Sequence, residues 1–239
     1  MAAPLPGLSV FLPSHNEEAN VERVVRGYLD ELPKLATDYE VIVVNDGSRD
    51  RTGQVAARLA DENPHVKVVN HEVNRGYGGA VISGIRASTM PYVMLSDGDG
   101  QFVPKDVEKL AAFMPEFDVV VGRRARRADH LMRRINGVAW TQLVRVVLGV
   151  TISDIDCGFK MFKRELLDAM ELRAHGAMIS TELMARLIGR GARIKEVDVQ
   201  HLPRTAGEQS GANLRVVMRA FRELFVLYAE LRAERRGRP

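Results

Sequence analysis

The first half of the chain alternates short apolar runs with longer segments in which apolar residues recur at helical spacing. The apolar runs are bounded by turn residues and predict strands at 8–12, 39–44, 66–70, 92–96 and 119–121. The segments between them predict helices at about 18–35, 51–63, 78–88 and 104–114. Such strand–helix alternation is typical of an α/β fold with a mostly parallel central sheet flanked by helices.

The second half has a less regular pattern. Residues 126–148 predict a basic amphipathic helix, and residues 213–234 predict a long helix with an apolar stripe. The region between them predicts an irregular loop at 154–163, helices near 164–170 and 181–190, and a strand at 193–199. Neither a repeat nor a linker interrupts the sequence, so we expect a single domain over residues 1–239.

Polar residues follow the first, second and fourth predicted strands. These segments are Ser-His-Asn-Glu at 14–17, Asn-Asp-Gly-Ser at 45–48 and Asp-Gly-Asp at 97–99. Open parallel sheets bind their ligands at the carboxyl ends of the strands. We therefore expect the three segments to converge on one crevice.

Asp97 and Asp99 are the central feature of this crevice. Side chains two residues apart on an extended segment point the same way, so both carboxylates can reach one object. Two carboxylates leave coordination positions for water and phosphate oxygens, as is usual for Mg²⁺ or Mn²⁺. The alternative is an ordinary turn, because Asp-Gly pairs are common in turns.

Two further stretches offer ligand contacts. The glycine-rich residues 74–80 follow the third strand, but Val81 replaces the third glycine of the dinucleotide fingerprint, which disfavours a nicotinamide dehydrogenase. This turn either offers N–H groups to an anion or allows the helix to pack closely on the sheet. Asp46, at the tip of the second strand, suits a base or ribose, while Asp50 suits helix capping.

Composition narrows the function classes. The 239 residues are 46% hydrophobic and 27% charged with a net charge of +3, which indicates a globular protein and gives no case for nucleic acid. Arginines cluster at 123–134 and 232–238, and such patches suit anionic substrates or anionic lipid surfaces. No apolar run approaches the ~18 residues that span a bilayer, and the N-terminus lacks the charged region of a signal peptide. We expect a cytoplasmic protein that contacts a membrane only peripherally.

The cysteine and the histidines suggest no separate site. The single cysteine, Cys157, fits a reducing compartment and is expected to be a small packed residue. The histidines, His71 among them, lack the spacing of a metal site, so we expect them in loops or at the surface.

Several motifs, at their present separations, resemble those of family 2 glycosyltransferases with the GT-A fold. They are residues 13–18, 44–48, 74–80 and 97–99. Residues 122–124, 156–160 and 204–207 are similar to dolichol-phosphate mannose synthases and bacterial polyprenyl-phosphate glycosyltransferases. The tail motif of that group is Arg-x-x-Gly-x-Ser, whereas here Ser210 comes one residue late.

The resemblance implies that different regions of the chain bind the donor, the acceptor and the membrane. It implies a nucleotide-sugar half at 1–122, an acceptor half at 123–212, and an amphipathic helix with a basic tail at 213–239. It also implies roles for single residues. The nucleotide would be bordered by Pro13, Asn16, Glu17, Asp46 and Gly76, with Asp46 reading the base. Mg²⁺ or Mn²⁺ would be held by Asp97, Asp99 and Gln101, and the acceptor phosphate by Arg123, Arg124, Arg134 and Arg204.

Two of these assignments have a purely structural alternative. Glu17 also suits the first turn of a helix, where acidic side chains are favoured. The arginines also suit a solvated basic helix face. Among the implied residues, Arg124 matches the Gly-x-Arg position of the family, and we group it with Asp97, Asp99 and Gln101 as catalytic.

The implied reaction is an inverting, metal-dependent transfer of a sugar from a UDP- or GDP-sugar to a polyprenyl phosphate at the cytoplasmic membrane surface. A phosphate monoester has a second pKa of about 6, so such an acceptor needs no strong general base. A hydroxyl acceptor would need one, for which Asp156 is the candidate. A nucleotide-sugar-binding protein without turnover is the third alternative. The sequence does not decide which sugar is transferred or which base the donor carries. It also leaves open whether a separate membrane-anchor protein docks the enzyme and whether the chain forms a homo-oligomer.

Overall fold

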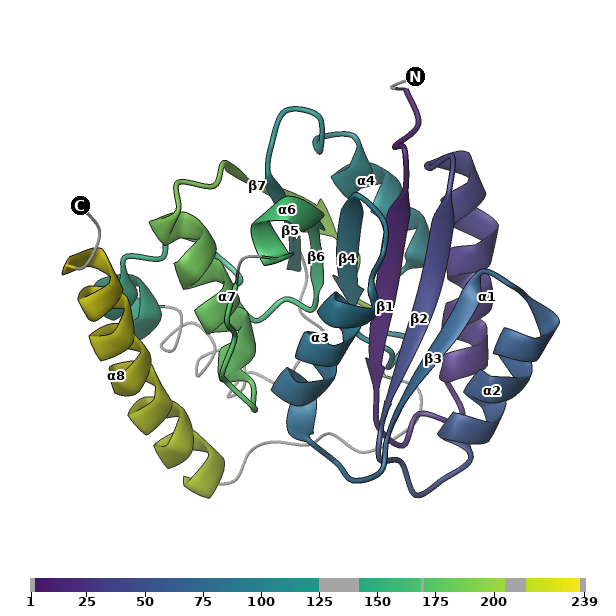
Figure 1. The fold of residues 1–239 in the computed structure, drawn as a ribbon, viewed down its shortest axis with the longest axis horizontal. Helices are drawn as coiled ribbons and strands as arrows, with labels where there is room; N and C mark the ends of the chain where they lie inside the picture. The colour runs from purple at the N-terminus through teal and green to yellow at the C-terminus, as the bar shows by residue number, and fades with distance from the viewer. Residues whose placement is uncertain (1–2, 125–141, 169, 205–213, 237–239) are drawn as a thin grey trace.

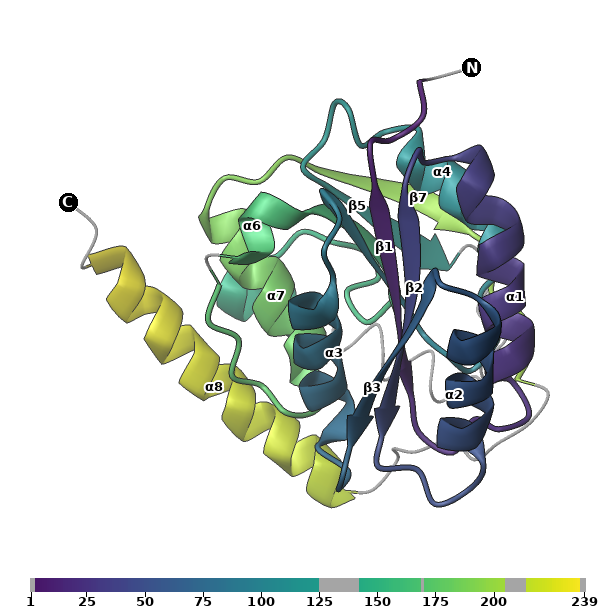
Figure 2. The same cartoon turned by 45° about the vertical axis from the view of Figure 1, so that its right-hand side comes forward.

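The fold is a seven-stranded sheet with helices on both faces (Figures 1 and 2). This computed structural model describes residues 3–124, 142–168, 170–204 and 214–236. The strands are β1 (Leu8–Ser14), β2 (Tyr39–Asp46), β3 (Val66–His71), β4 (Tyr92–Ser96), β5 (Val119–Arg124), β6 (Phe159–Lys163) and β7 (Ile194–Val199). Their order in the sheet is β3-β2-β1-β4-β6-β5-β7.

The sheet is parallel except at β6. β1 pairs in parallel with both β2 and β4, while β6 runs antiparallel between β4 and β5. The β1–β2 register runs from Leu8 opposite Tyr39 to Ser14 opposite Asn45, so these two strands end at the same level. Because β6 is reversed, its first residue, Phe159, lies opposite Ser96 at the end of β4.

The helices form two layers, one on each face of the sheet. One layer contains α1 (Val21–Glu31), α2 (Thr52–Glu62) and α4 (Val107–Ala111), with the short 3-10 helices η1 (Leu32–Lys34) and η2 (Pro104–Asp106). The other contains α3 (Gly76–Ala87), α6 (Arg164–Asp168), α7 (Met178–Gly189) and α8 (Leu214–Arg236), and residues 142–148 are also helical.

Strand alternation fills the two cores that these layers enclose. On β1, Val10 and Leu12 face the core under α1, while Phe11 faces the core under α3. A Cβ at Gly84 would lie 2.2 Å from the Phe11 ring, so this glycine permits the close packing of α3 on β1. The position of α3 matters because its first turn lies at the edge where the site forms.

The prediction of an α/β fold with a mostly parallel sheet is confirmed, and the five strands expected in the first half are all present. The irregular loop predicted at 154–163 is wrong in its second part, because residues 159–163 form β6. Two lysines in this five-residue run hide its strand character, yet Lys160 is fully buried and its Nζ donates to the carbonyl of Cys157. Most of the helix predicted at 126–148 lies outside the described residues.

α8 packs on α7 through leucines and a cluster of charges. Leu224, Leu227 and Leu231 are buried against the α7 side of the sheet. The guanidinium group of Arg186 on α7 contacts the carboxylates of Glu182, Glu230 and Glu234. None of the helices in the described parts of the chain is long and apolar enough to cross a membrane.

Candidate active site

The candidate site lies where the helix layers change sides. α1 and α2 cover one face of the sheet after β1 and β2, and α3 covers the other face before β4. In open α/β sheets such a switch point, between β1 and β4 here, leaves a crevice beyond the carboxyl ends of the strands. The loops after β1, β2 and β4 meet at this edge (Figure 1).

Backbone hydrogen bonds fix the loop that carries the two aspartates. The N–H of Asp97 donates to the carbonyl of Gly158 (3.1 Å), and the N–H of Gly98 donates to the carbonyl of Pro13 (3.2 Å). The N–H of Gln101 donates to Oδ1 of Asp99 (3.0 Å), which closes the turn. The carboxylate pair is therefore held between the ends of β1 and β6.

The side chain of Asp97 is confined on both of its oxygens. The hydroxyl of Tyr77, in the first turn of α3, donates to Oδ1 over 2.8 Å. A Cβ at Gly158 would lie 2.0 Å from Oδ2, so only glycine leaves room for this carboxylate. Burial, with the negative charge of Asp99 as the second cause, raises the pKa of Asp97 to about 7.

This donor set fits a magnesium or manganese ion. A divalent cation would offset the repulsion between the carboxylates of Asp97 and Asp99 that raises the pKa of Asp97. Among the described residues, no cluster of three or more histidine, cysteine or acidic side chains forms a dedicated metal cage. Two carboxylates are sufficient where water and substrate phosphates complete the coordination.

Gln101 and Arg204 connect this loop to the segment after β7. The amide Nε2 of Gln101 donates to the carbonyl of Leu202 over 3.0 Å. The guanidinium group of Arg204 lies 3.6 Å from Oδ2 of Asp99 and also contacts Glu17. Arg204 thus lies beside the carboxylate pair.

Glu17 is a buried member of the same cluster. Its carboxylate accepts hydrogen bonds from Arg204 and from Nδ2 of Asn20, the latter over 2.8 Å. Burial is the largest influence on its pKa, which is raised despite these two donors. Although Glu17 precedes α1, its side chain is committed to Arg204 and Asn20.

Asp46 is buried at the end of β2, next to the last residue of β3. Its Oδ1 accepts from Nδ1 of His71 (2.6 Å) and from the backbone N–H of Arg75 (2.8 Å). Asn16 lies on the adjacent loop with a φ of 56°, and its N–H donates to the hydroxyl of Ser48 (3.0 Å). Pro13 and Asp46 therefore lie at the carboxyl ends of β1 and β2, and Asn16 lies just beyond β1 at the same edge of the sheet.

The glycine-rich turn packs against the chain before α7. Gly76 has a φ of +80°, and a Cβ there would lie 2.6 Å from the carbonyl oxygen of His175. The N–H of Gly78 donates to the same carbonyl over 2.9 Å. These contacts favour the interpretation that the glycines allow close packing. The N–H of Gly78 is also occupied by a protein acceptor, so it is not offered to an anion.

The candidate acceptor arginines differ in their surroundings. Arg124 makes a two-pronged contact with Asp154, from Nε to Oδ2 and from Nη2 to Oδ1, each over 2.7 Å. Arg123 pairs with Asp198 over 2.6 Å, and both side chains are about half exposed. Arg134 lies outside the described residues, as does Ser210.

Four residues at the site escaped the sequence interpretation: Tyr77, His71, Asp154 and Lys160. Tyr77 lies inside a stretch considered only for its glycines. The expectation that His71 is at the surface is wrong, since its residue exposure is 6%. Lys160 is buried because β6 carries it into the protein, and burial lowers its pKa. The missed strand therefore concealed this residue.

Cys157 confirms the expectation of a small packed residue. It is fully buried, and burial raises the pKa of its thiol to about 12. A thiol with such a pKa is protonated near neutral pH and is a poor nucleophile.

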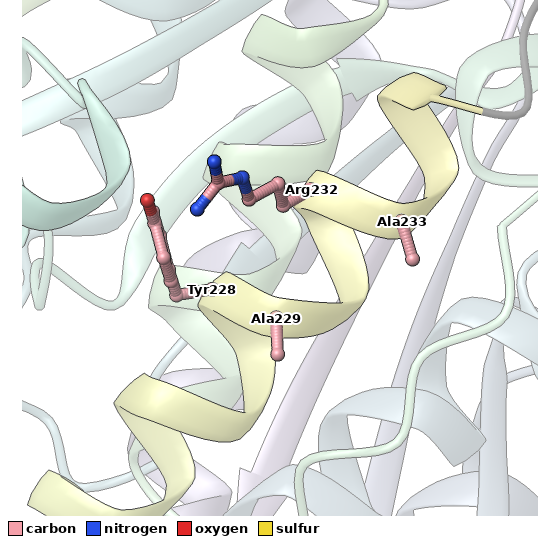
Figure 3. A pocket seen from close by; sticks show the side chains of 4 residues that line it. All are labelled: Tyr228, Ala229, Arg232 and Ala233. Atoms are coloured by element: carbon pink, nitrogen blue, oxygen red, sulfur yellow. The ribbon is translucent and has the colours of Figure 1, made fainter.

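α8 lies at the periphery of the molecule (Figure 1), and a hollow on this helix is seen from close by in Figure 3. It is lined by Tyr228, Ala229, Arg232 and Ala233, and the side chains of Tyr228 and Arg232 lie on the same side of the helix (Figure 3). All four residues come from one helix, so this hollow belongs to the outer surface of α8.

Comparisons with known proteins agree with this arrangement. Residues 9–170 match the model of glycosyl transferase family 2. The undecaprenyl-phosphate 4-deoxy-4-formamido-L-arabinose transferase of Pectobacterium atrosepticum is 27% identical over 216 residues, which cover 89% of this chain. The matched part is 65% of that relative, so the chain spans slightly less than two thirds of its length.

Solved structures show the same fold. The glucosyl-3-phosphoglycerate synthase of Mycobacterium tuberculosis, in complex with Mn²⁺, UDP and glucosyl-3-phosphoglycerate, superposes with a TM-score of 0.69 at 23% identity, over 95% of this chain and 80% of that chain. A further mycobacterial protein gives a TM-score of 0.74 at 21% identity, over 95% of this chain and 74% of that chain. The chain belongs to glycosyl transferase family 2 and has the GT-A fold.

Proposed function

We propose that the protein transfers a sugar from a nucleotide diphosphate sugar to a polyprenyl phosphate, with inversion at the anomeric carbon. The observation that carries this proposal is the carboxylate pair Asp97 and Asp99 at the switch point between β1 and β4. The name of the Pectobacterium relative, which specifies undecaprenyl phosphate, supports the acceptor class.

The residues of the crevice match the charge that this reaction develops. A leaving nucleotide diphosphate gains negative charge as the sugar bond breaks. Mg²⁺ or Mn²⁺, held by Asp97 and Asp99, would stabilise that charge as a Lewis acid. Gln101 and Arg204 adjoin the pair. Arg204, which the family resemblance assigned to the acceptor phosphate, lies 3.6 Å from Asp99, and we assign its positive charge to the leaving diphosphate instead.

For a phosphate acceptor, the protein has to bind and orient the phosphate with arginines and does not have to supply a general base. A lipid monophosphate is largely ionised near neutral pH, so its oxygen can attack without proton removal by the protein. Asp154 fixes the plane of the Arg124 guanidinium group, which leaves its orientation defined for phosphate binding. Arg123 and Arg134 are assigned to the same acceptor.

A polyprenyl acceptor stays in the membrane, so the protein must reach it there. α8 exposes Phe225, Val226 and Tyr228 with exposed fractions of 58%, 51% and 40%. Arg222 and Arg232 are exposed on the same helix. Apolar side chains flanked by basic ones bind an anionic membrane surface reversibly, and we assign this contact to α8.

A hydroxyl acceptor is the second candidate function. The synthase complexes contain phosphoglycerate or its glucosylated product, and Asp156, the candidate base, is exposed next to the buried start of β6. This alternative requires transfer to a soluble phosphorylated acceptor in the absence of lipid.

A transfer assay separates the two candidates. Purified protein is incubated with labelled UDP- or GDP-sugars, Mg²⁺ or Mn²⁺, and either polyprenyl phosphate in detergent or 3-phosphoglycerate. We expect an acid-labile glycolipid, lost on chelation of the metal and reduced about a hundredfold or more by Asp99→Asn. Asp61→Asn, at an exposed position of α2, is the control and should retain activity. Full activity of Asp99→Asn contradicts the metal assignment, and labelled phosphoglycerate contradicts the acceptor assignment.

A further inference from the structure

Both protein hydrogen bonds to the carboxylate of Asp46 are made to the same oxygen, Oδ1. The residue is only 3% exposed, and its Oδ1 accepts from His71 and from the N–H of Arg75 over 2.6 and 2.8 Å. A carboxylate oxygen accommodates two donors through its two lone pairs. Oδ1 is therefore saturated by the protein, and Oδ2 is left as the oxygen that can meet a ligand.

His71 owes its orientation to contacts on both ring nitrogens. It ends β3 directly opposite Asp46 in the parallel register, and its Nε2 lies 2.8 Å from the hydroxyl of Ser83 on α3. Because a carboxylate only accepts, Nδ1 carries the hydrogen; in the neutral ring, Nε2 then accepts from Ser83. The carboxylate of Asp46 thus selects the tautomer, and the hydrogen bond to Ser83 holds the ring in the plane from which Nδ1 donates.

We propose that His71, held by Ser83, is a positioning residue that makes Asp46 a single-oxygen acceptor selective for uracil over guanine. The proposal rests on the proposed function, because it concerns the base of the sugar donor. Uracil presents one imide N–H, which one oxygen satisfies. Guanine presents two adjacent N–H donors, which pair best with both oxygens of one carboxylate. With Oδ1 saturated, the pocket satisfies uracil and leaves one guanine donor unpaired.

The alternative is a purely structural role, in which the hydrogen bonds of His71 only hold β2, β3 and α3 together. Asp46 also accepts from Nδ1 of His15 through its backbone carbonyl, so its main chain is held without His71. If the side-chain pair were only structural, substitutions at His71 would change stability and would leave the preference between bases unchanged.

The test is calorimetric titration of the full chain with UDP and with GDP, each in the presence of Mn²⁺. We expect the wild-type protein to bind UDP at least tenfold more tightly than GDP. His71→Phe removes one of the two donors to Oδ1, which leaves this oxygen able to accept from the ligand as well, and should weaken UDP binding about tenfold and abolish the preference. His71→Asn should retain the preference, since an asparagine amide can donate from a position close to Nδ1.

Two further variants separate positioning from folding. Ser83→Ala removes only the hydroxyl that holds the His71 ring through Nε2, and we expect a several-fold loss of UDP affinity. His65→Phe is the matched control. This histidine, just before β3, contacts the carbonyl of Tyr39 and stacks on its ring, and the variant should bind UDP like the wild type.

Equal affinities of the wild type for the two nucleotides, or an unchanged preference in His71→Phe, would overturn the inference. The titration needs no lipid, so the acceptor assignment does not affect it. Transfer from a GDP-sugar to the lipid would likewise overturn the inference and leave the proposed function intact.

Discussion

At the residue scale, the position of Asp97 depends on a neighbour that has no side chain. Tyr77 holds Oδ1 by a hydrogen bond, and the missing Cβ of Gly158 leaves the space for Oδ2. The backbone of Gly158 accepts from the N–H of Asp97 in the same place. The glycine therefore sets how closely β6 approaches the carboxylate pair.

This close approach predicts that Gly158→Ala displaces Asp97. A methyl group 2.0 Å from Oδ2 forces the carboxylate away, which should weaken Mn²⁺-dependent nucleotide binding at least tenfold, about 1.4 kcal/mol. The measurement is calorimetric titration of UDP with and without Mn²⁺. Gly189→Ala is the control, because an added Cβ there meets open space. Unchanged Mn²⁺-dependent binding in Gly158→Ala would show that Asp97 does not hold the metal.

The sequence allowed the residues of single motifs to be predicted, but not their partners. Asp46, Asp97 and Asp99 follow apolar runs, so their place at the strand ends could be deduced from the chain alone. Their partners lie several residues beyond the end of a strand, where the pattern does not show which way a side chain turns. Tyr77 reaches Asp97 from the first turn of α3, and Arg204 reaches Asp99 from beyond β7. Only the tertiary packing of α3 and β7 brings these side chains to the crevice.

At the scale of elements, Asp118 links β6, the strand that the sequence did not predict, to β5 and β7. It precedes β5, and its Oδ1 accepts from Nζ of Lys163 at the end of β6 over 2.8 Å. Its Oδ2 accepts from the backbone N–H of Arg193, before β7, over 2.9 Å. One carboxylate thus links three strands where they meet, although its neighbours in sequence predict none of these contacts.

The pairing of Asp118 predicts a stability effect that depends on pH. Hydrogen bonds from Arg193 and Lys163 hold the pKa of Asp118 well below its usual value of 3.8. The stabilisation is complete above that value and is lost as the pH falls towards the lower pKa of the folded state. Asp118→Asn should cost about 1 kcal/mol at pH 7, and this difference should shrink as the pH falls below 3.8.

Urea unfolding of both proteins across this pH range measures the effect. Asp198→Asn is the control, since its pair with Arg123 is about half exposed and should contribute little. A cost of Asp118→Asn that stays constant into acid would show that the charge of Asp118 contributes nothing.

At the scale of the whole molecule, α8 lies against α7, and within the described part of the chain its other side exposes Phe225 and Val226. The buried guanidinium group of Arg186 contacts Glu182 on α7 and both Glu230 and Glu234 on α8. Glu182 also accepts from the backbone N–H groups of Arg173 and Ala174, just before the residues that pack on the first turn of α3. α8 is therefore connected through α7 to the helix that supplies Tyr77.

The side of α8 that exposes Phe225 and Val226 gives the last prediction. Replacing Phe225 and Val226 together with serine removes apolar surface from an exposed position, so the fold should be retained. If this surface enters the membrane interface, binding to vesicles that contain phosphatidylglycerol should weaken about tenfold, as expected for ~1.4 kcal/mol of lost burial. Sedimentation with vesicles measures the effect, and Val73→Ser, 68% exposed in the loop after β3, is the control. Equal sedimentation of the double variant and the wild type would exclude this side of α8 as the membrane contact.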